Sequence, residues 1–141
     1  MTPKERAEKS AAAMWVNDEA SKWFGMKIVE VGEGHSVLTL TITGNHCNGH
    51  GICHGGVTHA LADSAFAFAC NSRNVATVGQ HTMISYLAPG RKGDSLTATA
   101  TEVSVTGRSG IYDVRVTNQD NTLIAEFRGM SRAVGGQNFQ E

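Results

Sequence analysis

Hydrophobic residues recur at helical spacing near the N-terminus, where a set of four follows the opening Pro3: Ala7, Ala11, Met14 and Trp15. A second short helix is predicted between Asp18, a favourable N-cap, and Gly25, a favourable helix end. From Met26 onward, hydrophobic and polar residues alternate instead, which is typical of a strand that buries one face. The pattern therefore predicts a helical lead-in over residues 1–25, followed by a sheet.

The alternating pattern predicts about six strands. The first two form a hairpin over residues 26–42, with a turn at Gly32-Glu33-Gly34. The other four lie in the second half of the chain, at Thr77–Leu87, Ser95–Val105, Ile111–Thr117 and Thr122–Ala133. Because turn-forming residues separate them, the last three strands are expected to form an antiparallel meander.

One long segment between the hairpin and the later strands is predicted to be a buried helix. Residues 57–70 are rich in Ala and are apolar nearly all round, which is typical of a helix covered on most sides. The natural packing is a curved antiparallel sheet around this long central helix, an α+β arrangement. We expect a single domain over residues 1–141, with residues 135–141 as a flexible tail.

Composition narrows the class of protein. The 141 residues are 40% hydrophobic and carry a formal net charge of -1, which argues against a disordered chain and against a basic nucleic-acid binder. A membrane-spanning helix needs about 20 apolar residues. The longest apolar stretch is shorter than that, and it carries Asp63 in its middle. The N-terminus lacks the apolar region of a signal peptide, and the three cysteines are an odd number. We therefore expect a cytoplasmic protein that binds neither nucleic acid nor membranes.

Asp63 is the first candidate for chemistry. It is the only formally charged residue between Val57 and Cys70, and the helix pattern predicts that it is buried. A buried carboxylate is costly unless its pKa rises or hydrogen-bond donors surround it. Two explanations stay open: a structural hydrogen bond or subunit contact, and a catalytic base or nucleophile.

The start of the same helix is a second candidate site. At His54-Gly55-Gly56 the glycines would let a ligand approach backbone N–H groups that the helix leaves unpaired. Such N–H groups can bind an oxyanion or a carbonyl oxygen, although a glycine pair can also simply form a tight turn. Asn48 lies in the preceding loop, where its amide could orient a water molecule or serve only as a turn residue.

The spacing of these candidates predicts a site shared between subunits. Gly55 and Asp63 are separated by eight residues, or about 12 Å along a helix, too far for both to touch one carbonyl group. If two such helices packed antiparallel across a twofold axis, Gly55 of one subunit would lie beside Asp63 of the other. We therefore expect a homodimer with shared active sites.

Histidines and cysteines are concentrated in one region, at His46, Cys47, His50, Cys53, His54 and His59. These are residue types that bind zinc. Their spacing does not fit the usual ligand pairs, and glycines interrupt the segment, so we expect no metal site. Cys53 next to His54 also allows a cysteine nucleophile, although adjacency in sequence does not establish the geometry that this chemistry needs.

Two motifs resemble those of the hotdog-fold acyl-CoA thioesterases: Asn48-Gly49-His50-Gly51-Ile52-Cys53-His54-Gly55-Gly56 and Leu61-Ala62-Asp63-Ser64-Ala65. The similarity runs from Met14 to Gly129 and is greatest to the phenylacetate-degradation (PaaI) subfamily. It implies a hotdog fold, dimers that pair into a homotetramer, and hydrolysis of acyl-CoA thioesters. It also implies that this reaction needs no metal and no bound cofactor.

The resemblance implies a role for each candidate residue. The aspartate matching Asp63 activates water or attacks as a nucleophile, and the N–H matching Gly55 polarises the thioester carbonyl. The asparagine matching Asn48 helps to hold water or substrate. Substrate and CoA binding is implied for a further set: His54, Gly56, Tyr86, Pro89, Gly90, Arg91, Gly107 and Arg108. For the arginines, which lie in turns, solvent exposure without a ligand is the alternative.

Substrate choice and one detail of the site stay open. Some relatives have a serine near the position of Gly79, where the nearest hydroxyl groups here belong to Thr77 and Thr82. The subfamily implies an aryl- or arylacetyl-CoA ester as substrate, with ring-hydroxylated phenylacetyl-CoA as the specific expectation. The alternatives are a hydratase or dehydratase, which would need a histidine such as His59 or His81 near the carboxylate, and a non-catalytic acyl-CoA-binding module.

Overall fold

The computed structural model describes residues 1–141 and contains three α-helices and a six-stranded sheet. The helices are α1 (Pro3–Val16), α2 (Glu19–Phe24) and α3 (Gly55–Cys70), and a short 3-10 turn spans Gly44–His46. The strands are β1 (Lys27–Gly32), β2 (His35–Thr41), β3 (Thr77–Tyr86), β4 (Ser95–Thr106), β5 (Ser109–Thr117) and β6 (Leu123–Ala133). The helices and strands expected from the sequence are confirmed, with ends that agree or differ by at most two residues.

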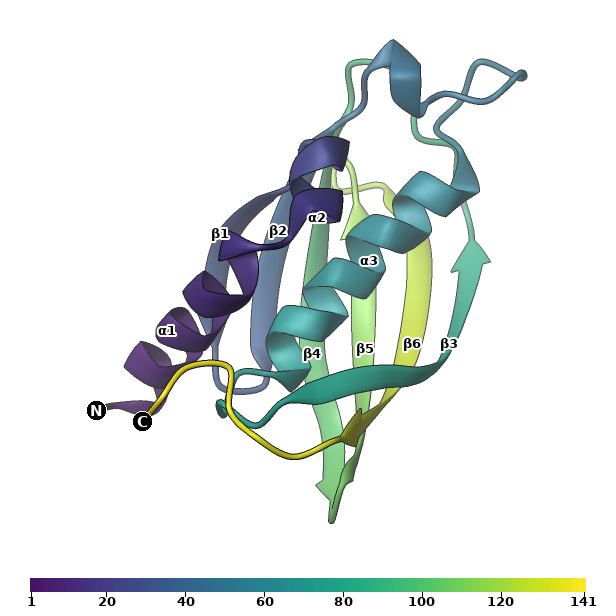
Figure 1. Ribbon diagram of the computed structural model, residues 1–141. Helices are drawn as coiled ribbons and strands as arrows, with labels where there is room; N and C mark the ends of the chain where they lie inside the picture. The colour runs from purple at the N-terminus through teal and green to yellow at the C-terminus, as the bar shows by residue number, and fades with distance from the viewer.

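The sheet is antiparallel throughout, with the strand order β1-β2-β4-β5-β6-β3. Helix α3 crosses one face of this curved sheet, and α1 lies beside β1 at one edge (Figure 1). This arrangement of a long central helix and a wrapping sheet is the expected hotdog architecture. The meander expected for the last three strands is confirmed as β4-β5-β6.

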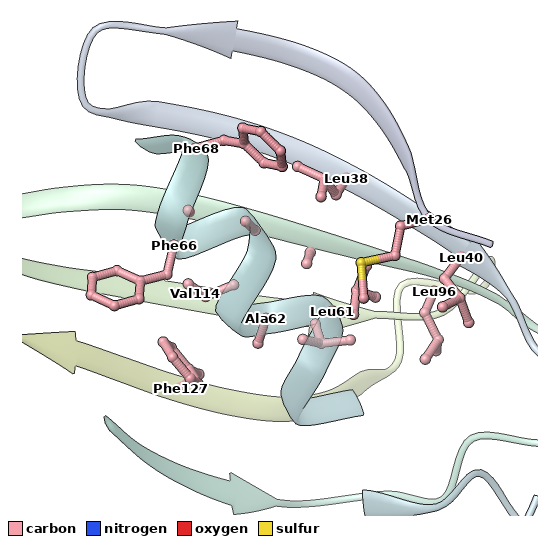
Figure 2. Close-up of a cluster of buried hydrophobic side chains, with 14 of the residues drawn as sticks. Met26, Leu38, Leu40, Leu61, Ala62, Phe66, Phe68, Leu96, Val114 and Phe127 are labelled. Atoms are coloured by element: carbon pink, nitrogen blue, oxygen red, sulfur yellow. The ribbon is translucent and has the colours of Figure 1, made fainter. Parts of the chain in front are cut away.

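Helix α3 forms the centre of the core. Leu61, Ala62 and Ala65 are fully buried, and Phe66 packs its ring near those of Tyr112 and Phe127. Figure 2 shows these side chains between the helix and the strands behind it. Small alanines let the helix lie close to the sheet, while the aromatic rings fill the space at its flanks. No helix of the chain is long and apolar enough to cross a membrane.

Strand β3 lies at an edge of the sheet and is mostly exposed. It pairs with β6 alone, from Thr77 opposite Ala133 to Tyr86 opposite Ala125. Several of its large hydrophobic side chains face solvent, with Met83 59% exposed and Val78 51% exposed. A ten-residue edge strand of this kind offers unpaired backbone groups and apolar side chains to another chain.

The tail over residues 135–141, expected to be flexible, is tied to the domain. The Asn138 backbone N–H donates to Asn74 Oδ1 over 2.9 Å, and Asn138 Nδ2 donates to Ser10 Oγ over 2.9 Å. At the end of the tail, Glu141 forms an ion pair with Arg6 of α1, with 2.6 Å between the charged atoms. Polar groups of the tail, of α1 and of the turn at Asn74 therefore hydrogen-bond to one another. The composition of the tail alone did not indicate this.

Candidate active site

The N-terminus of α3 presents a free backbone donor. His54 is the N-cap, and its Nδ1 accepts a hydrogen bond of 2.8 Å from the Gly56 N–H. Tyr86 at the end of β3 donates its hydroxyl to the Gly55 carbonyl over 2.8 Å. The N–H of Gly55 has no acceptor within the chain, since the first N–H groups of a helix lack intrahelical partners. This N–H therefore remains available to bind an oxygen atom of a ligand.

Gly55 is also closely packed. A Cβ atom at this position would lie 3.0 Å from the Tyr86 ring, so a larger residue would displace the tyrosine. Glycine is needed here because the backbone and the ring approach each other closely. The hydrogen bond and the packing together fix the first turn of α3 against the end of β3.

A cleft of about 520 Å³ opens beside this helix start. Its lining includes five of the predicted site residues, namely Asn48, Gly55, Tyr86, Pro89 and Gly90. Cys53, considered from the sequence only as a nucleophile or metal ligand, also lines it. The sequence did not indicate the other lining residues, which are Ile52, Thr58, Leu87, Ala88 and Ile124. Most of these are ordinary apolar residues, so nothing in their sequence pattern marks them as cleft residues. The structure thus brings the loop, the helix start and the end of β3 to one site.

Asn48 is held by its own loop. Its side-chain Oδ1 accepts hydrogen bonds from the backbone N–H groups of His50, at 3.0 Å, and Ile52, at 3.4 Å. Its side-chain nitrogen has no acceptor within the chain, which leaves an N–H donor for a ligand in the cleft. The amide is therefore both a turn residue and a donor positioned for binding.

The turn that follows β3 is fixed next to the same loop. Cys53 N–H donates to the Gly90 carbonyl over 2.8 Å, and Asp94 Oδ2 accepts from the Arg91 N–H over 2.9 Å. Gly90 is required by packing, because a Cβ there would lie 2.8 Å from the Cδ1 atom of Ile42. Arg91 is exposed and directly follows Gly90 of the cleft lining.

Asp63 lies in the middle of α3, and its position differs from the expectation. The sequence predicted a buried carboxylate, but in the single chain Asp63 is exposed. The helix turns Ala62 and Phe66 toward the sheet and leaves Asp63 on the side facing β3, where the sheet ends. Neighbouring protein atoms still displace water and raise the pKa of Asp63 above its usual value, while the charge of His59 acts in the opposite direction.

No hydroxyl replaces the serine that some relatives have near Gly79. A Cβ at Gly79 would lie 3.1 Å from the Phe66 ring and 4.0 Å from Asp63 Oδ1, so the backbone of β3 passes close to both side chains. Thr82 forms its hydrogen bond with His59 Nε2 at 3.1 Å, and Thr77 donates to the Val75 carbonyl at 2.7 Å. Both threonines are thus engaged elsewhere.

A single chain does not bring all the predicted site residues together. Asp63 is not part of the cleft at Gly55. Gly107 and Arg108 line a separate cavity of about 120 Å³ at the other end of the sheet. The Arg108 carbonyl accepts from the Ala133 N–H over 2.8 Å, and Ala133 is opposite the first residue of β3, whereas Tyr86 is the last. Ten residues of strand make the separation about 30 Å.

The histidine and cysteine cluster is spread over several local contacts. His46 Nδ1 accepts from the Thr43 N–H at 2.9 Å, and its Nε2 contacts the Phe24 carbonyl at 2.8 Å. His59 packs its ring on Phe127, with 5.4 Å between ring centres. No three His, Cys, Asp or Glu side chains lie together in a way that could hold a metal ion.

Comparison with known proteins identifies the family. Residues 50–125 match the thioesterase superfamily, and the chain belongs to this superfamily. It is 44% identical over 131 residues to the acyl-coenzyme A thioesterase PaaI of Escherichia coli, covering 93% of this chain and 94% of that protein. The resemblance to the phenylacetate-degradation subfamily inferred from the sequence is thereby confirmed.

Solved structures agree with this assignment. The structure of the E. coli PaaI protein from the phenylacetic acid degradation operon superposes with a TM-score of 0.95 at 42% identity, over 96% of this chain and 99% of that one. A Streptococcus mutans protein bound to acetyl CoA superposes with a TM-score of 0.77 at 26% identity, over 79% of this chain and 90% of that one. The hotdog fold expected from the sequence is confirmed.

Proposed function

We propose that the chain hydrolyses aryl- or arylacetyl-CoA thioesters, including ring-hydroxylated phenylacetyl-CoA, to the free acid and CoA. The observation that carries this proposal is the unpaired Gly55 N–H at the start of α3, which opens onto a cleft beside Tyr86 and Asn48. The similarity to a relative named as an acyl-coenzyme A thioesterase supports the reaction. The arylacetyl substrate is supported by the phenylacetic acid degradation operon from which the E. coli structure comes.

In the proposed mechanism, the thioester oxygen accepts a hydrogen bond from the Gly55 N–H. The helix dipole of α3 adds partial positive charge there, so the negative charge that develops on this oxygen is stabilised. Asp63 removes a proton from the attacking water or attacks the carbonyl carbon itself, and Asn48 orients the water or substrate. The bond between carbon and sulfur then breaks, and the CoA thiolate leaves and takes up a proton. In the route by direct attack, water then hydrolyses the anhydride formed on Asp63, which releases the free acid and restores the carboxylate.

The proposed active unit is a homodimer, with dimers pairing into a homotetramer. Antiparallel pairing of β3 with its copy would cover the exposed edge and bring the Thr77 end of one strand beside the Tyr86 end of the other. The same symmetry would bring Asp63 and Arg108 of one subunit toward Gly55 and Tyr86 of the other. Arg91 and Arg108 would then flank one groove and bind the phosphates of CoA.

We further propose that the enzyme acts in the cytoplasm without a metal or cofactor. The groups that the mechanism requires are a carboxylate, a backbone N–H and an amide, and the chain supplies each of them. The expected result is that turnover survives treatment with a strong chelator. Three free cysteines are compatible with a reducing compartment.

A panel of acyl-CoA esters tests the function. Phenylacetyl, hydroxyphenylacetyl, benzoyl and straight-chain esters are mixed with the wild type and with Asp63→Asn, and loss of the thioester absorbance is recorded. We expect fastest loss with the aryl esters and a decrease of about 10²- to 10⁴-fold in the variant, because the base is removed. Glu8→Gln, exposed on α1 at the β1 edge of the sheet and outside the lining of the cleft, is the matched control and should retain the wild-type rate.

The same panel distinguishes the alternatives. Saturable binding of the esters with no thioester loss would favour a non-catalytic acyl-CoA-binding module. An enoyl-CoA ester added to the panel tests for a hydratase, which would remove the enoyl double bond while the thioester persists. Equal rates for wild type and Asp63→Asn would remove the catalytic role of this carboxylate.

A further inference from the structure

Cys47 and Cys53 face each other at the base of the loop that carries Asn48. The two residues form an isolated antiparallel bridge, and the hydrogen bonds lie on either side of them. Asn48 N–H donates to the Ile52 carbonyl over 2.8 Å, and His54 N–H donates to the His46 carbonyl over 2.8 Å. Cys47 and Cys53 are therefore a non-hydrogen-bonded pair, the type in which opposing side chains lie closest.

This backbone arrangement fits a disulfide. Opposite residues in a non-hydrogen-bonded antiparallel pair have Cα atoms about 4.5 Å apart, and disulfides span Cα separations of about 4.4 to 6.8 Å. The two side chains also point to the same face of the ladder, since they are directly opposed. A bond between the sulfur atoms therefore requires rotation of the side chains rather than a new path of the backbone.

Both thiols are free and only weakly held. Cys47 Sγ donates to the Thr43 carbonyl over 3.5 Å, and Cys53 Sγ lies 3.6 Å from the Thr58 hydroxyl. Hydrogen bonds of a thiol are weak, so their loss opposes bond formation very little. Cys53 also lines the proposed CoA cleft, through which a small oxidant can reach the pair.

We propose that Cys47 and Cys53 form a reversible disulfide by exchange with a low-molecular-weight disulfide, and that this bond lowers turnover at the adjacent site. In the first step one cysteine thiolate attacks the small disulfide, forms a mixed disulfide and releases one small thiol. In the second step the other cysteine attacks the mixed disulfide and releases a second small thiol. The two cysteines lose two electrons and two protons, and the small disulfide gains them.

The environments of the two thiols set the order of attack. Cys47 is partly exposed, whereas Cys53 is only 7% exposed and burial raises the pKa of its thiol. Attack on an external disulfide needs access and a thiolate, so Cys47 reacts first and Cys53 resolves the mixed disulfide. Cys70 does not compete, because burial at the far end of α3 raises the pKa of its thiol to about 12.

The loop that the disulfide would close is short. A bridge across a short loop restricts the unfolded chain less, and so stabilises the fold less, than a bridge across a long loop. Exposed disulfides are the more easily reduced ones, and Cys47 at one end of this bond is partly exposed. The pair is therefore suited to report the redox state of its surroundings.

The expected effect on turnover follows from the contacts that Cys53 makes beside the cleft. It rests on the proposed function. Cys53 is bonded through its N–H to the Gly90 carbonyl and through its thiol to Thr58 in the first turn of α3. Rotation of its sulfur toward Cys47 removes the contact with Thr58, which lies three residues after Gly55 in α3. Because small displacements of catalytic groups reduce rates strongly, we expect a decrease of about tenfold, reversed by dithiothreitol.

The test combines mass and rate measurements on the full-length protein. Reduced protein is incubated with glutathione disulfide, remaining thiols are alkylated, and intact mass and peptides are analysed. Turnover is followed by thioester absorbance, which avoids thiol reagents that would react with the cysteines themselves. Cys47→Ser removes one partner, and Cys70→Ala is the matched control that retains the pair.

In the wild type and in Cys70→Ala we expect a peptide linking Cys47 to Cys53 and a lower rate that dithiothreitol restores. In Cys47→Ser we expect no internal disulfide. We therefore expect no increase in rate from reduction of such a bond by dithiothreitol. The proposal is overturned if both thiols stay alkylatable, if the bond involves Cys70, or if the disulfide forms with an unchanged rate. If reduced protein consumes no thioester at all, the proposed function has failed, while the mass measurement still decides whether the pair forms.

Discussion

Asp63 combines an exposed position with a raised pKa. Protein atoms around it displace water and favour the neutral carboxyl, while His59, one turn earlier on α3, favours the carboxylate. As a base or nucleophile, the side chain must be ionised. The rate is therefore expected to decline as pH falls through the raised pKa of Asp63, at a higher pH than for an ordinary aspartate.

His59→Gln tests this balance. The substitution removes the positive charge that lowers the pKa of Asp63, so the acidic limb of kcat/KM against pH should move to higher pH. His35→Gln, on β2 away from the helix, is the control and should leave the profile in place. A limb that moves to lower pH, or does not move, contradicts the assigned influence of His59.

At this scale the sequence singled out Asp63 as a lone carboxylate in an apolar helix, and its catalytic role stays a prediction. The burial predicted for it was wrong, because Asp63 is exposed in the single chain. The periodicity could not show that one side of α3 lies at the edge of the sheet. That position depends on which strands pair with one another. The apolar residues that line the cleft were not predicted for a similar reason. Leu87 and Ile124 have the sequence pattern of core residues.

Among the elements, the packing of β6 against α3 depends on Gly129, which lies at the contact between them. The Gly129 position lies under the Phe66 ring, and a Cβ there would be 2.8 Å from two ring atoms. Gly129→Ala should therefore destabilise the fold by about 1–3 kcal/mol, because the ring must leave its place in a packed core. Urea unfolding measures this loss as a lower midpoint.

Gly32→Ala at the end of β1 is the matched control for that substitution. A Cβ at Gly32 has nothing within 4 Å, so its midpoint should stay close to that of the wild type. Equal midpoints for the two variants would contradict the packing of Phe66 against β6.

The strands themselves were largely predictable, and their order was only partly so. Alternation and turn residues give each strand and the β4-β5-β6 meander, because these are local features. The pairing of β3 with β6 joins segments far apart in the chain, and no local pattern encodes it. The Cys47–Cys53 bridge is likewise visible only once the loop is folded.

For the whole molecule, Asp63 lies outside the cleft of its own chain, so the proposed mechanism requires the proposed homodimer. Asn48→Ala and Asp63→Asn should each be inactive alone, because every site in either homodimer lacks one group. In a mixed dimer, one site carries both substitutions and the other carries neither. Unfolding and refolding the two variants together should restore about a quarter of the wild-type activity if subunits associate at random.

Refolding each variant with wild-type protein is the control for this experiment. It should give about half of the wild-type activity whether or not subunits exchange, so the mass of the refolded dimers is what reports exchange. Activity that stays at the level of the separate variants, with exchange demonstrated by mass, would mean that each chain builds its own site.

The contact between Arg6 and Glu141 has a consequence for the topology of the chain. The two termini lie side by side (Figure 1), and the tail is bonded to α1 through Ser10. A short peptide could therefore join them into a circular backbone, which could be reopened at the exposed turn around Asn121. In such a circular permutant α1 would follow β6 directly, and every strand pairing would be kept. The order in which the elements are synthesised is thus separable from the order in which they pack.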